Sequence, residues 1–407
     1  MSSDHLVTDV VIVGAGPAGV SAGIQLVRAG RDVVIIDKAT FPRDKICGDG
    51  LTTAALRELE DLGLEPASVE SWTAVDDVIV RSPSGHTVTF ALPRDAGQYA
   101  AIATRLDLDS ALVDRARKEG VVVVEGASLE TLDDRNDGVT VHTSRGGFNA
   151  RYVVAADGMW SPTRKALGLA TPGYLGEWHA FRQYFSNVTG PASSHLVVSF
   201  EADLLPGYFW AFPLPDGRAN VGFGIERGRK HRTRDMKQLW PDLLARPHLR
   251  ELLGPDATPE GMHRAWPIPA QLSKVPSGTG RVLFVGDALS ACDPMTGEGI
   301  GQALESGRLA AAALDGRWDR PVSVQEQYRE LLSATLAADQ RMSNLLMRAL
   351  AHRKGVRSSV RLAGSTAWTR RNFVRWLFED EPRGIAFTPR RWHRGLLSRP
   401  GAFVERT

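Results

Sequence analysis

The opening of the chain alternates short apolar runs with one helical pattern. Val10–Val13 is an uninterrupted apolar run of strand length, and residues 17–29 place apolar side chains at helical spacing. Gly30 ends that pattern, and a second apolar run over Val33–Ile36 ends in Asp37. This order predicts a strand, a helix and a second, parallel strand, which is the repeating unit of an α/β fold.

The later chain predicts further helices, buried strands and antiparallel strands in separate stretches. We expect helices at residues 51–62 and 104–118, a long Ala-rich helix from about Ile300, and short buried strands at residues 121–124, 153–156 and 282–285. Antiparallel strands with Gly, Pro or Asn turns are expected at residues 75–92, 129–155 and 176–271, and an irregular polar loop at residues 41–49.

Residues 176–271 are rich in aromatic side chains and are interpreted as a separate, substrate-binding sheet. The aromatic positions are Trp178, Phe181, Tyr184, Phe185, Tyr208, Phe209, Trp210, Phe212 and Phe223. For most of these rings, packing in the core of an ordinary sheet is the favoured interpretation.

Three glycines follow the first strand as G-x-G-x-x-G. Gly14 permits a tight turn, Gly16 lets a pyrophosphate approach the backbone, and Gly19 lets the helix pack closely on the strand. The N-terminus of the helix would present free N–H groups to the phosphates, and Asp37 could bind a ribose hydroxyl. The alternative is an ordinary glycine-rich turn, but the order of all five pieces predicts dinucleotide binding.

A second motif, D-G-x-x-S-x-x-R, extends from Asp157 to Arg164 directly after the strand expected at residues 153–156. One interpretation is a turn followed by a helix that Ser161 caps. The other is a binding segment, which the position after a strand favours.

A third motif follows the strand expected at residues 282–285. Gly286 and Asp287 stand at its carboxyl end, where open α/β sheets bind ligands. Gly297, Gly299 and Ile300 then begin a helix whose N-terminus can face an anion.

Composition narrows the class of protein. At 407 residues, 43% of them apolar, the chain has material for two or three domains, and its net charge of +2 with no recognition motif argues against nucleic-acid binding. Cys47 and Cys292 are too few for a disulfide framework, so a reducing, cytoplasmic compartment is expected. The polar N-terminus is unlike a signal peptide, and no run reaches the ~18–20 apolar residues of a membrane span.

The C-terminal region, residues 351–407, is basic, with thirteen Lys/Arg and four Asp/Glu. Apolar residues recur at helical spacing at Val356, Val360, Ala363 and Ala367. Basic residues recur at the same spacing at Arg353, Arg357 and Arg361. The aromatic and aliphatic residues that follow are Trp368, Phe373, Trp376, Leu377 and Phe378. Two interpretations stay open. One is a peripheral contact with the inner face of a membrane, and the other is a helix packed on the dinucleotide-binding domain with its arginines in water.

With these signals in this order, the chain resembles the FAD-dependent oxidoreductases of the p-hydroxybenzoate hydroxylase-like fold. Within them, FPRDKICGDGL and PGYFWAFPLPDG are similar to segments of the geranylgeranyl reductase family, whose actinobacterial branch includes menaquinone reductases. The resemblance is strong over residues 8–330. It implies an α/β fold made of a Rossmann-like FAD-binding domain (1–72, 100–175 and 272–330), an inserted antiparallel β-sheet substrate domain (73–99 and 176–271) and a C-terminal helical, basic region (331–407).

The resemblance also implies cofactor roles. Gly14, Gly16 and Gly19 would hold the FAD pyrophosphate, and Asp37 would bind the adenosine ribose. Asp157 would lie near the adenosine half, Arg105 would contact the flavin side, and Asp287 would hold the ribityl chain or pyrophosphate. The residues expected beside the isoalloxazine are Pro294, Gly297, Gly299 and Ile300. The implied cofactor-binding set further includes Ala18, Lys38, Cys47, Gly48 and Gly286. No second G-x-G-x-x-G follows a strand, so NAD(P)H or another reductant would have no dedicated domain. No metal ligands are assigned.

The implied chemistry is hydride delivery from reduced FAD to an isolated C=C bond, whose other carbon needs a proton. Cys47, in the K-x-C-G-D segment from Lys45 to Asp49, is the first candidate acid, because a thiol with a pKa of about 8.5 is protonated at neutral pH. The alternative for Cys47 is a small buried apolar residue, and Cys292 is expected to pack. Tyr208 and Trp210 of the Y-x-W-x-F-P pattern would line an apolar tunnel, and the Tyr208 hydroxyl would orient Cys47 or a water.

The function implied is thus FAD-dependent reduction of isoprenoid C=C bonds on a prenyl lipid or a quinone side chain, with an apolar molecule as substrate. A flavin monooxygenase acting on a polycyclic or terpenoid molecule is the runner-up, since one scaffold serves both chemistries. A flavin halogenase and a flavoprotein without enzymatic activity are further alternatives. Cys47 and the aromatic motif favour the reductase.

Overall fold

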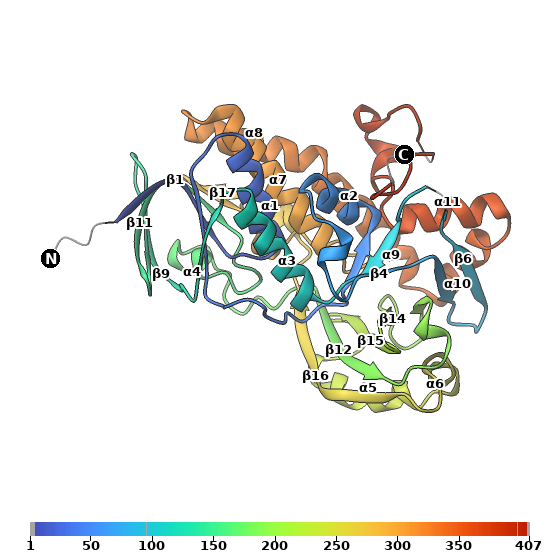
Figure 1. Ribbon diagram of the computed structural model, residues 1–407. Helices are drawn as coiled ribbons and strands as arrows, with labels where there is room; N and C mark the ends of the chain where they lie inside the picture. Colours follow the sequence, from blue (N-terminus) through green and yellow to red (C-terminus); the bar gives the residue numbers. More distant parts are fainter. Residues whose placement is uncertain (1–4, 95, 397, 405–407) are drawn as a thin grey trace.

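The computed structural model describes residues 5–94, 96–396 and 398–404, and its first layer is a largely parallel sheet (Figure 1). The strand order is β17-β18-β11-β1-β2-β8. The strands are β1 Leu6–Val13, β2 Val33–Asp37, β8 Val122–Glu125, β11 Gly146–Ala155, β17 Gly278–Thr279 and β18 Val282–Phe284, with β9 Leu129–Asp134 and β10 Val139–Thr143 paired antiparallel beside β11. The apolar runs at its centre are buried on both faces, as parallel strands require.

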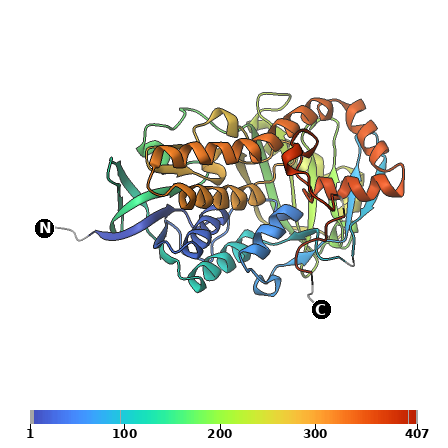
Figure 2. The same ribbon diagram turned by 90° about the horizontal axis from the view of Figure 1, so that it is seen from above.

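Helices cover this sheet and complete its core. They are α1 Pro17–Arg28, α3 Arg105–Lys118, α7 Ile300–Arg317 and α8 Pro321–Ala334, with the short α2 Thr53–Asp61 and α4 Pro162–Ala166 nearby. α1 and α7 lie side by side (Figures 1 and 2). The Ser161 hydroxyl accepts a hydrogen bond from the Arg164 N–H, so the predicted serine cap of α4 is confirmed.

The turn between β1 and α1 depends on two glycines. Gly14 has a φ of +107°, and a Cβ built on it would lie 2.4 Å from the carbonyl oxygen of Ala156. A Cβ on Gly19 would lie 1.9 Å from the carbonyl oxygen of Gly14. The close packing of helix on strand that was predicted for Gly19 is therefore confirmed.

A second sheet of seven strands forms the other large layer, in the order β16-β12-β15-β14-β13-β5-β6. Its strands are β5 Asp77–Arg81, β6 Thr87–Ala91, β12 Trp178–Ser186, β13 Leu196–Ser199, β14 Phe209–Leu214, β15 Arg218–Glu226 and β16 Thr258–Ile268. All neighbours are antiparallel except β13 and β5. A small third sheet contains β3 Gly50–Thr52, β4 Thr73–Ala74 and β7 Ala100–Ile102.

The aromatic residues of the second sheet divide between its two faces. Phe181, Phe185, Phe209 and Phe223 form a core with the helices α5 Met236–Leu244 and α6 Pro247–Leu253, which confirms the core interpretation for these rings. Trp178, Tyr208, Trp210 and Phe212 instead line a cavity on the opposite side.

The C-terminal helices are α9 Leu336–Leu350, α10 Arg353–Ala363 and α11 Ala367–Leu377. The apolar side of α10, with Val356 and Val360, packs with Val374 of α11 on β5 and β6 of the second sheet. The same apolar cluster includes Ala100 and Ile102 of the predicted FAD-binding domain, and the arginines of α10 are exposed, as one of the two open interpretations has it. The membrane contact stays a prediction. The expected continuous series to Ala367 was wrong, because α10 ends at Ala363 and Ala367 starts a new helix.

Among the residues that the structure describes, no helix is both long enough and apolar enough to cross a membrane. The predicted domain limits stay a prediction, and their outermost residues, 1–4 and 405–407, lie outside the described residues.

Gly19 and Gly16 differ in the space that surrounds them, so an added methyl group should destabilise the fold at Gly19 and have little effect at Gly16. Gly19→Ala forces backbone atoms apart and is expected to lower the free energy of unfolding by about 1–3 kcal/mol or more. Gly16→Ala is the matched control, because its Cβ would meet its nearest atom, in Arg43, at 3.7 Å, an ordinary contact. Thermal and denaturant unfolding of both variants measures the difference, and equal stability would contradict the packing argument.

Candidate active site

A cavity of about 880 Å³ lies between the two large sheets and reaches the C-terminal helices. Its volume is that of a pocket for a drug-sized or larger ligand. Predicted site residues in its wall are Gly14, Gly16, Ala18, Asp37, Lys38, Cys47, Gly48, Arg105, Asp157, Tyr208, Trp210, Gly286, Asp287, Gly297, Gly299 and Ile300. Among the described residues, this wall does not include Gly19, which packs against Gly14, or Pro294, which is buried behind it.

One end of the cavity is a polar cradle at the N-terminus of α1. Gly16 caps α1 in extended conformation, so the first N–H groups of the helix face the cavity end. The Asp37 carboxylate, at the end of β2, accepts hydrogen bonds from the N–H groups of Ala15 and Ala39, each at 2.8 Å. The backbone therefore fixes Asp37 where a ribose could reach it.

Asp157 is placed at the same end with one free oxygen. Its Oδ2 accepts a hydrogen bond from the Thr163 N–H at 2.8 Å, whereas its Oδ1 is buried and has no hydrogen-bond partner among the described residues. Burial raises the pKa of Asp157. An unpartnered oxygen in a cavity wall fits a ligand that carries a hydroxyl or N–H donor.

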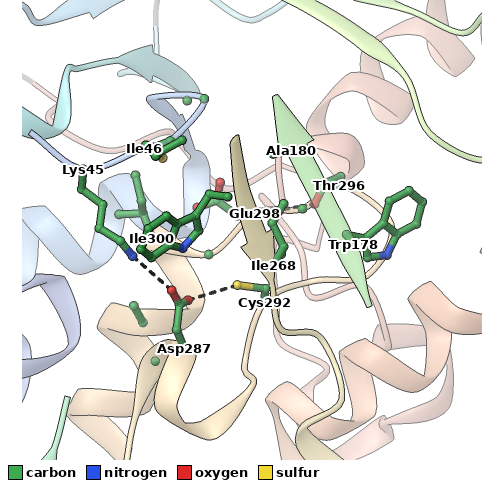
Figure 3. Close-up of a pocket in the computed structure, with 18 of the residues that line it drawn as sticks. Lys45, Ile46, Trp178, Ala180, Ile268, Asp287, Cys292, Thr296, Glu298 and Ile300 are labelled. Carbon is green, nitrogen blue, oxygen red and sulfur yellow. Dashed lines mark hydrogen bonds and ion pairs between the residues drawn. The ribbon is translucent and has the colours of Figure 1, made fainter. Parts of the chain in front are cut away.

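Asp287 follows β18 in a single 3₁₀ turn, Gly286–Leu289, and holds two partners (Figure 3). Lys45 Nζ lies 3.2 Å from its Oδ2, and the Cys292 thiol donates to its Oδ1 at 3.3 Å. Burial alone would raise the pKa of Asp287, but the charge of Lys45 and these hydrogen bonds outweigh burial and hold it below its usual value. Cys292 is thus buried as expected, and it also orients Asp287.

Arg105 begins α3 and is fixed by an ion pair. Its Nε and Nη2 each donate to Asp109, one turn later, at 2.7 Å, and Arg43 Nη1 lies 2.8 Å from the same carboxylate. The pair is buried, so Arg105 presents a rigid positive charge to the cavity wall.

Cys47 is held by its backbone rather than by its side chain. The carbonyl oxygen of Cys47 accepts hydrogen bonds from Asn220 Nδ2 at 2.9 Å and from Arg182 Nε at 3.2 Å. Asn220 also accepts a hydrogen bond from Trp210 Nε1 at 3.0 Å. The two predicted catalytic positions Cys47 and Trp210 are therefore joined through Asn220, a residue that the sequence analysis did not single out.

The thiol of Cys47 is a poor nucleophile and a well-protonated donor. Burial and the charge of Asp49 together raise the pKa of Cys47 to about 11, against the opposing charge of Arg105. The thiol therefore carries its proton across the whole neutral pH range and faces the cavity.

The Tyr208 hydroxyl donates to the carbonyl oxygen of Thr296, in the loop before α7. It therefore holds this loop. Among the described residues the Tyr208 hydroxyl has no hydrogen bond to Cys47, and its expected orientation of a water stays a prediction. Trp210 fits against β15 because Gly222, its cross-strand neighbour, has no side chain: a Cβ there would lie 2.3 Å from the indole ring.

Glu298 is a second residue that sequence reasoning missed. It lies in the cavity wall (Figure 3). Its Oε1 accepts a hydrogen bond from the Gly301 N–H at 2.9 Å. Burial and the nearby charge of Glu379 raise the pKa of Glu298 to about 8. The motif G-E-G before a helix was visible, but the raised pKa of its carboxyl gave no signal, because it depends on burial and on the charge of Glu379 from the distant C-terminal region.

The comparisons with known proteins agree with this geometry. An FAD-binding domain family matches residues 7–315. The menaquinone reductase of Mycobacterium tuberculosis is 36% identical over 333 residues, which cover 76% of this chain and 77% of that protein. Digeranylgeranylglycerophospholipid reductase 2 of Methanopyrus kandleri is 32% identical over 321 residues, 74% of this chain and 75% of that protein.

Among solved structures, a geranylgeranyl bacteriochlorophyll reductase-like protein from Thermoplasma acidophilum has the same fold. Its TM-score is 0.76 at 20% identity, and the match covers 95% of this chain and 100% of that one. The expected mixed α/β fold is therefore confirmed.

The raised pKa of Glu298 predicts a pH-dependent stability. A carboxyl whose folded-state pKa lies above its unfolded value stabilises the fold fully below the unfolded pKa and loses that contribution as pH rises toward about 8. Glu298→Gln is expected to reduce the fall in unfolding free energy between pH 5 and 8 by on the order of 1–2 kcal/mol. Denaturant unfolding at both pH values tests this, and identical slopes in both proteins would contradict it.

Proposed function

Because the chain belongs to the geranylgeranyl reductase family of FAD-dependent oxidoreductases, we propose that it saturates isoprenoid C=C bonds of a prenyl lipid or a prenylated quinone. One observation carries the proposal: a protonated thiol, Cys47, shares an aromatic-lined cavity with the glycine cradle. The relatives named above are reductases of menaquinone and of a geranylgeranyl lipid, which supports this class of substrate.

The residues of the cradle fit FAD. The N-terminus of α1 suits the pyrophosphate, and the unpartnered Asp157 Oδ1 and the fixed Asp37 suit hydroxyl or amine donors of the ligand. Asp287 and the loop from Gly297 to Ile300 would hold the remainder. When bound, FAD supplies the hydride, and NAD(P)H or another reductant is proposed to supply its electrons.

The chain's own contribution to the reaction is a proton and a dry surrounding. An isolated alkene is not polarised, so the second carbon needs a donor already aimed at it. The Cys47 thiol is proposed as that donor, and the rings of Tyr208, Trp210 and Phe212 exclude water from it.

The far end of the cavity supports an elongated, apolar substrate. There the wall is formed by α9, α10 and α11, and its residues are Leu346, Ala349, Leu350, Val356, Ser359, Val360, Phe373, Trp376, Leu377 and Phe378. An isoprenoid tail would bury its apolar surface against these side chains at about 25 cal/mol per Å².

The reductase proposal predicts anaerobic oxidation of the reduced enzyme by its substrate. The FAD-loaded protein is reduced without oxygen and mixed with prenylated quinone or geranylgeranyl diphosphate. We expect return of the oxidised flavin spectrum with a saturated product, slowed about 10²–10⁴-fold in Cys47→Ala. The FAD content and the thermal unfolding of Cys47→Ala are measured first, so that a slow rate is assigned to the missing thiol and not to lost cofactor or lost fold.

Two results would count against this reading. Unchanged rates in Cys47→Ala would remove Cys47 as the acid. No anaerobic oxidation, but substrate-dependent oxygen consumption with a hydroxylated product, would replace the reductase with the monooxygenase.

We also propose that residues 351–404 contact an anionic membrane surface, from which a lipid substrate would be taken. Leu362 and Trp368 are 70% and 69% exposed, and exposed arginines of α10 and α11 surround them. Reversing Arg357 and Arg361 to Glu is expected to weaken binding to phosphatidylglycerol vesicles at least about tenfold. Arg135→Glu, an exposed reversal on the β9–β10 turn, is the control, and equal binding by all three proteins would contradict the contact.

A further inference from the structure

The loop after β2 places two acidic groups together, the thiol of Cys47 and the carboxyl of Asp49. Asp49 is fully buried and has a φ of +65°, in the left-handed region that Asp and Asn tolerate better than most residues. Asn220 Nδ2 donates hydrogen bonds to the Cys47 carbonyl oxygen and to Asp49 Oδ2, so one buried amide holds both residues. Cys47 and Asp49 both line the cavity.

One oxygen of Asp49 is satisfied and the other is free. Oδ2 accepts hydrogen bonds from the Tyr184 hydroxyl and from Asn220 Nδ2, each at 2.7 Å. Oδ1 is buried and has no hydrogen-bond partner among the described residues. An ionised carboxylate would leave this oxygen without a donor, whereas a protonated carboxyl needs fewer donors.

Charged groups reach this pair from several packed elements. They are Arg105 on α3, Arg182 on β12 and Glu298 in the loop before α7, while the Tyr184 hydroxyl on β12 contributes a hydrogen bond. Asp44, in the same loop as Cys47, pairs with Arg182. Burial raises the pKa of Asp49 to about 6, although Arg182 and the hydrogen bonds from Tyr184 and Asn220 act to lower it. Arg182 is shared with Asp44, which lies 3.1 Å away, so its charge is partly engaged.

The two groups cannot both be ionised at low cost. The carboxylate of Asp49 raises the pKa of Cys47, and a thiolate at Cys47 would raise that of Asp49 in turn. A Cys47 that has lost its proton is therefore compatible with a protonated Asp49 and opposed by an ionised one.

We propose that Asp49 is the positioning residue through which Cys47 gives up and regains its proton. The proposal rests on the role of Cys47 as the acid. As the S–H bond breaks, a C–H bond forms on the substrate carbon that did not receive the hydride. The Asp49 O–H then breaks as the S–H bond re-forms, and Asp49, which lines the cavity, takes a proton from water that enters the cavity after the product leaves. The pair carries one negative charge at most throughout.

The first test measures the thiol itself and needs no activity. Cys47 is alkylated with iodoacetamide at pH 8, and the modified peptide is quantified by mass spectrometry, which separates it from Cys292. Asp49→Asn keeps the shape and suits the left-handed backbone but removes the charge. We expect alkylation about tenfold faster than in the wild type, equivalent to a drop of about one unit in the pKa of Cys47.

Asp44→Asn is the matched control, because Asp44 also pairs with Arg182 but is not among the charges that act on Cys47. Unchanged or slower alkylation in Asp49→Asn would overturn the proposal. An equal rise in Asp44→Asn would also overturn it, because the effect would then be a general loosening of the loop. Thermal unfolding and FAD content verify that both variants are folded.

The second test is the pH profile of the anaerobic oxidation. In the wild type the rate is expected to fall as pH rises above about 6, and in Asp49→Asn to stay level between pH 6 and 8. Tyr184→Phe removes a hydrogen bond that lowers the pKa of Asp49, so the midpoint should move to higher pH. A profile unchanged in both variants would overturn the relay.

These outcomes separate the relay from the proposed function. If Cys47→Ala keeps the rate of flavin oxidation, the role of Cys47 as the acid has failed. If Cys47→Ala is slow but alkylation and pH profile ignore Asp49, the acid stands and the relay has failed.

Discussion

The amide of Asn220 is the contact on which the geometry of the site depends. Its Nδ2 donates to the Cys47 carbonyl and to Asp49, and its Oδ1 accepts from Trp210. Asn220 belongs to the second sheet, whereas Cys47 and Asp49 belong to the loop after β2 of the first. Because the Asn220 amide is fully buried, the loss of one hydrogen-bond partner would cost about 1–3 kcal/mol. These hydrogen bonds therefore hold the loop in a fixed position on the second sheet.

A second set of buried polar contacts joins the C-terminal segment to the loop before α7. Arg383 lies 3.4 Å from Asp293 and 3.2 Å from Glu379, and Glu379 accepts hydrogen bonds from Thr52 and Gln302. This network fixes the loop that carries Glu298. The C-terminal segment that follows the helices at the far end of the cavity is therefore held to the loop before α7 by ion pairs. These ion pairs act together with apolar packing to hold the two ends of the cavity in place.

The sequence patterns predicted the features that depend on contacts between residues close in sequence. The βαβ unit, the packing of Gly19 on Gly14 and the serine cap of α4 depend on residues close in sequence, and the structure has them. The aromatic residues of the second sheet were recognised as a group, but their division between core and cavity depends on which face α5 and α6 cover. The contact of the Tyr208 hydroxyl with Thr296 and the packing of α10 on β5 and β6 were not predicted for the same reason, since both contacts are long-range.

Asn220 and Asp49 were missed, and of the two only Asn220 has a feature in the sequence that indicates a structural role. Asn220 is a polar residue inside the otherwise apolar strand RANVGFGIE, and a buried amide there requires partners from elsewhere. Asp49 was quoted in its motif but given no role, because its left-handed backbone and the pairing with Tyr184 are features of the folded chain.

Burial gives this site both its specificity and its acid. An apolar wall suited to an isoprenoid tail also withdraws water from every ionisable group in it, and the pKa values of Cys47, Asp49 and Glu298 rise together. The same wall that selects an apolar substrate thus shifts each of these acids toward its protonated form. A mutation that admits water to widen the substrate range would lower these pKa values too, so substrate range and proton supply cannot be altered independently.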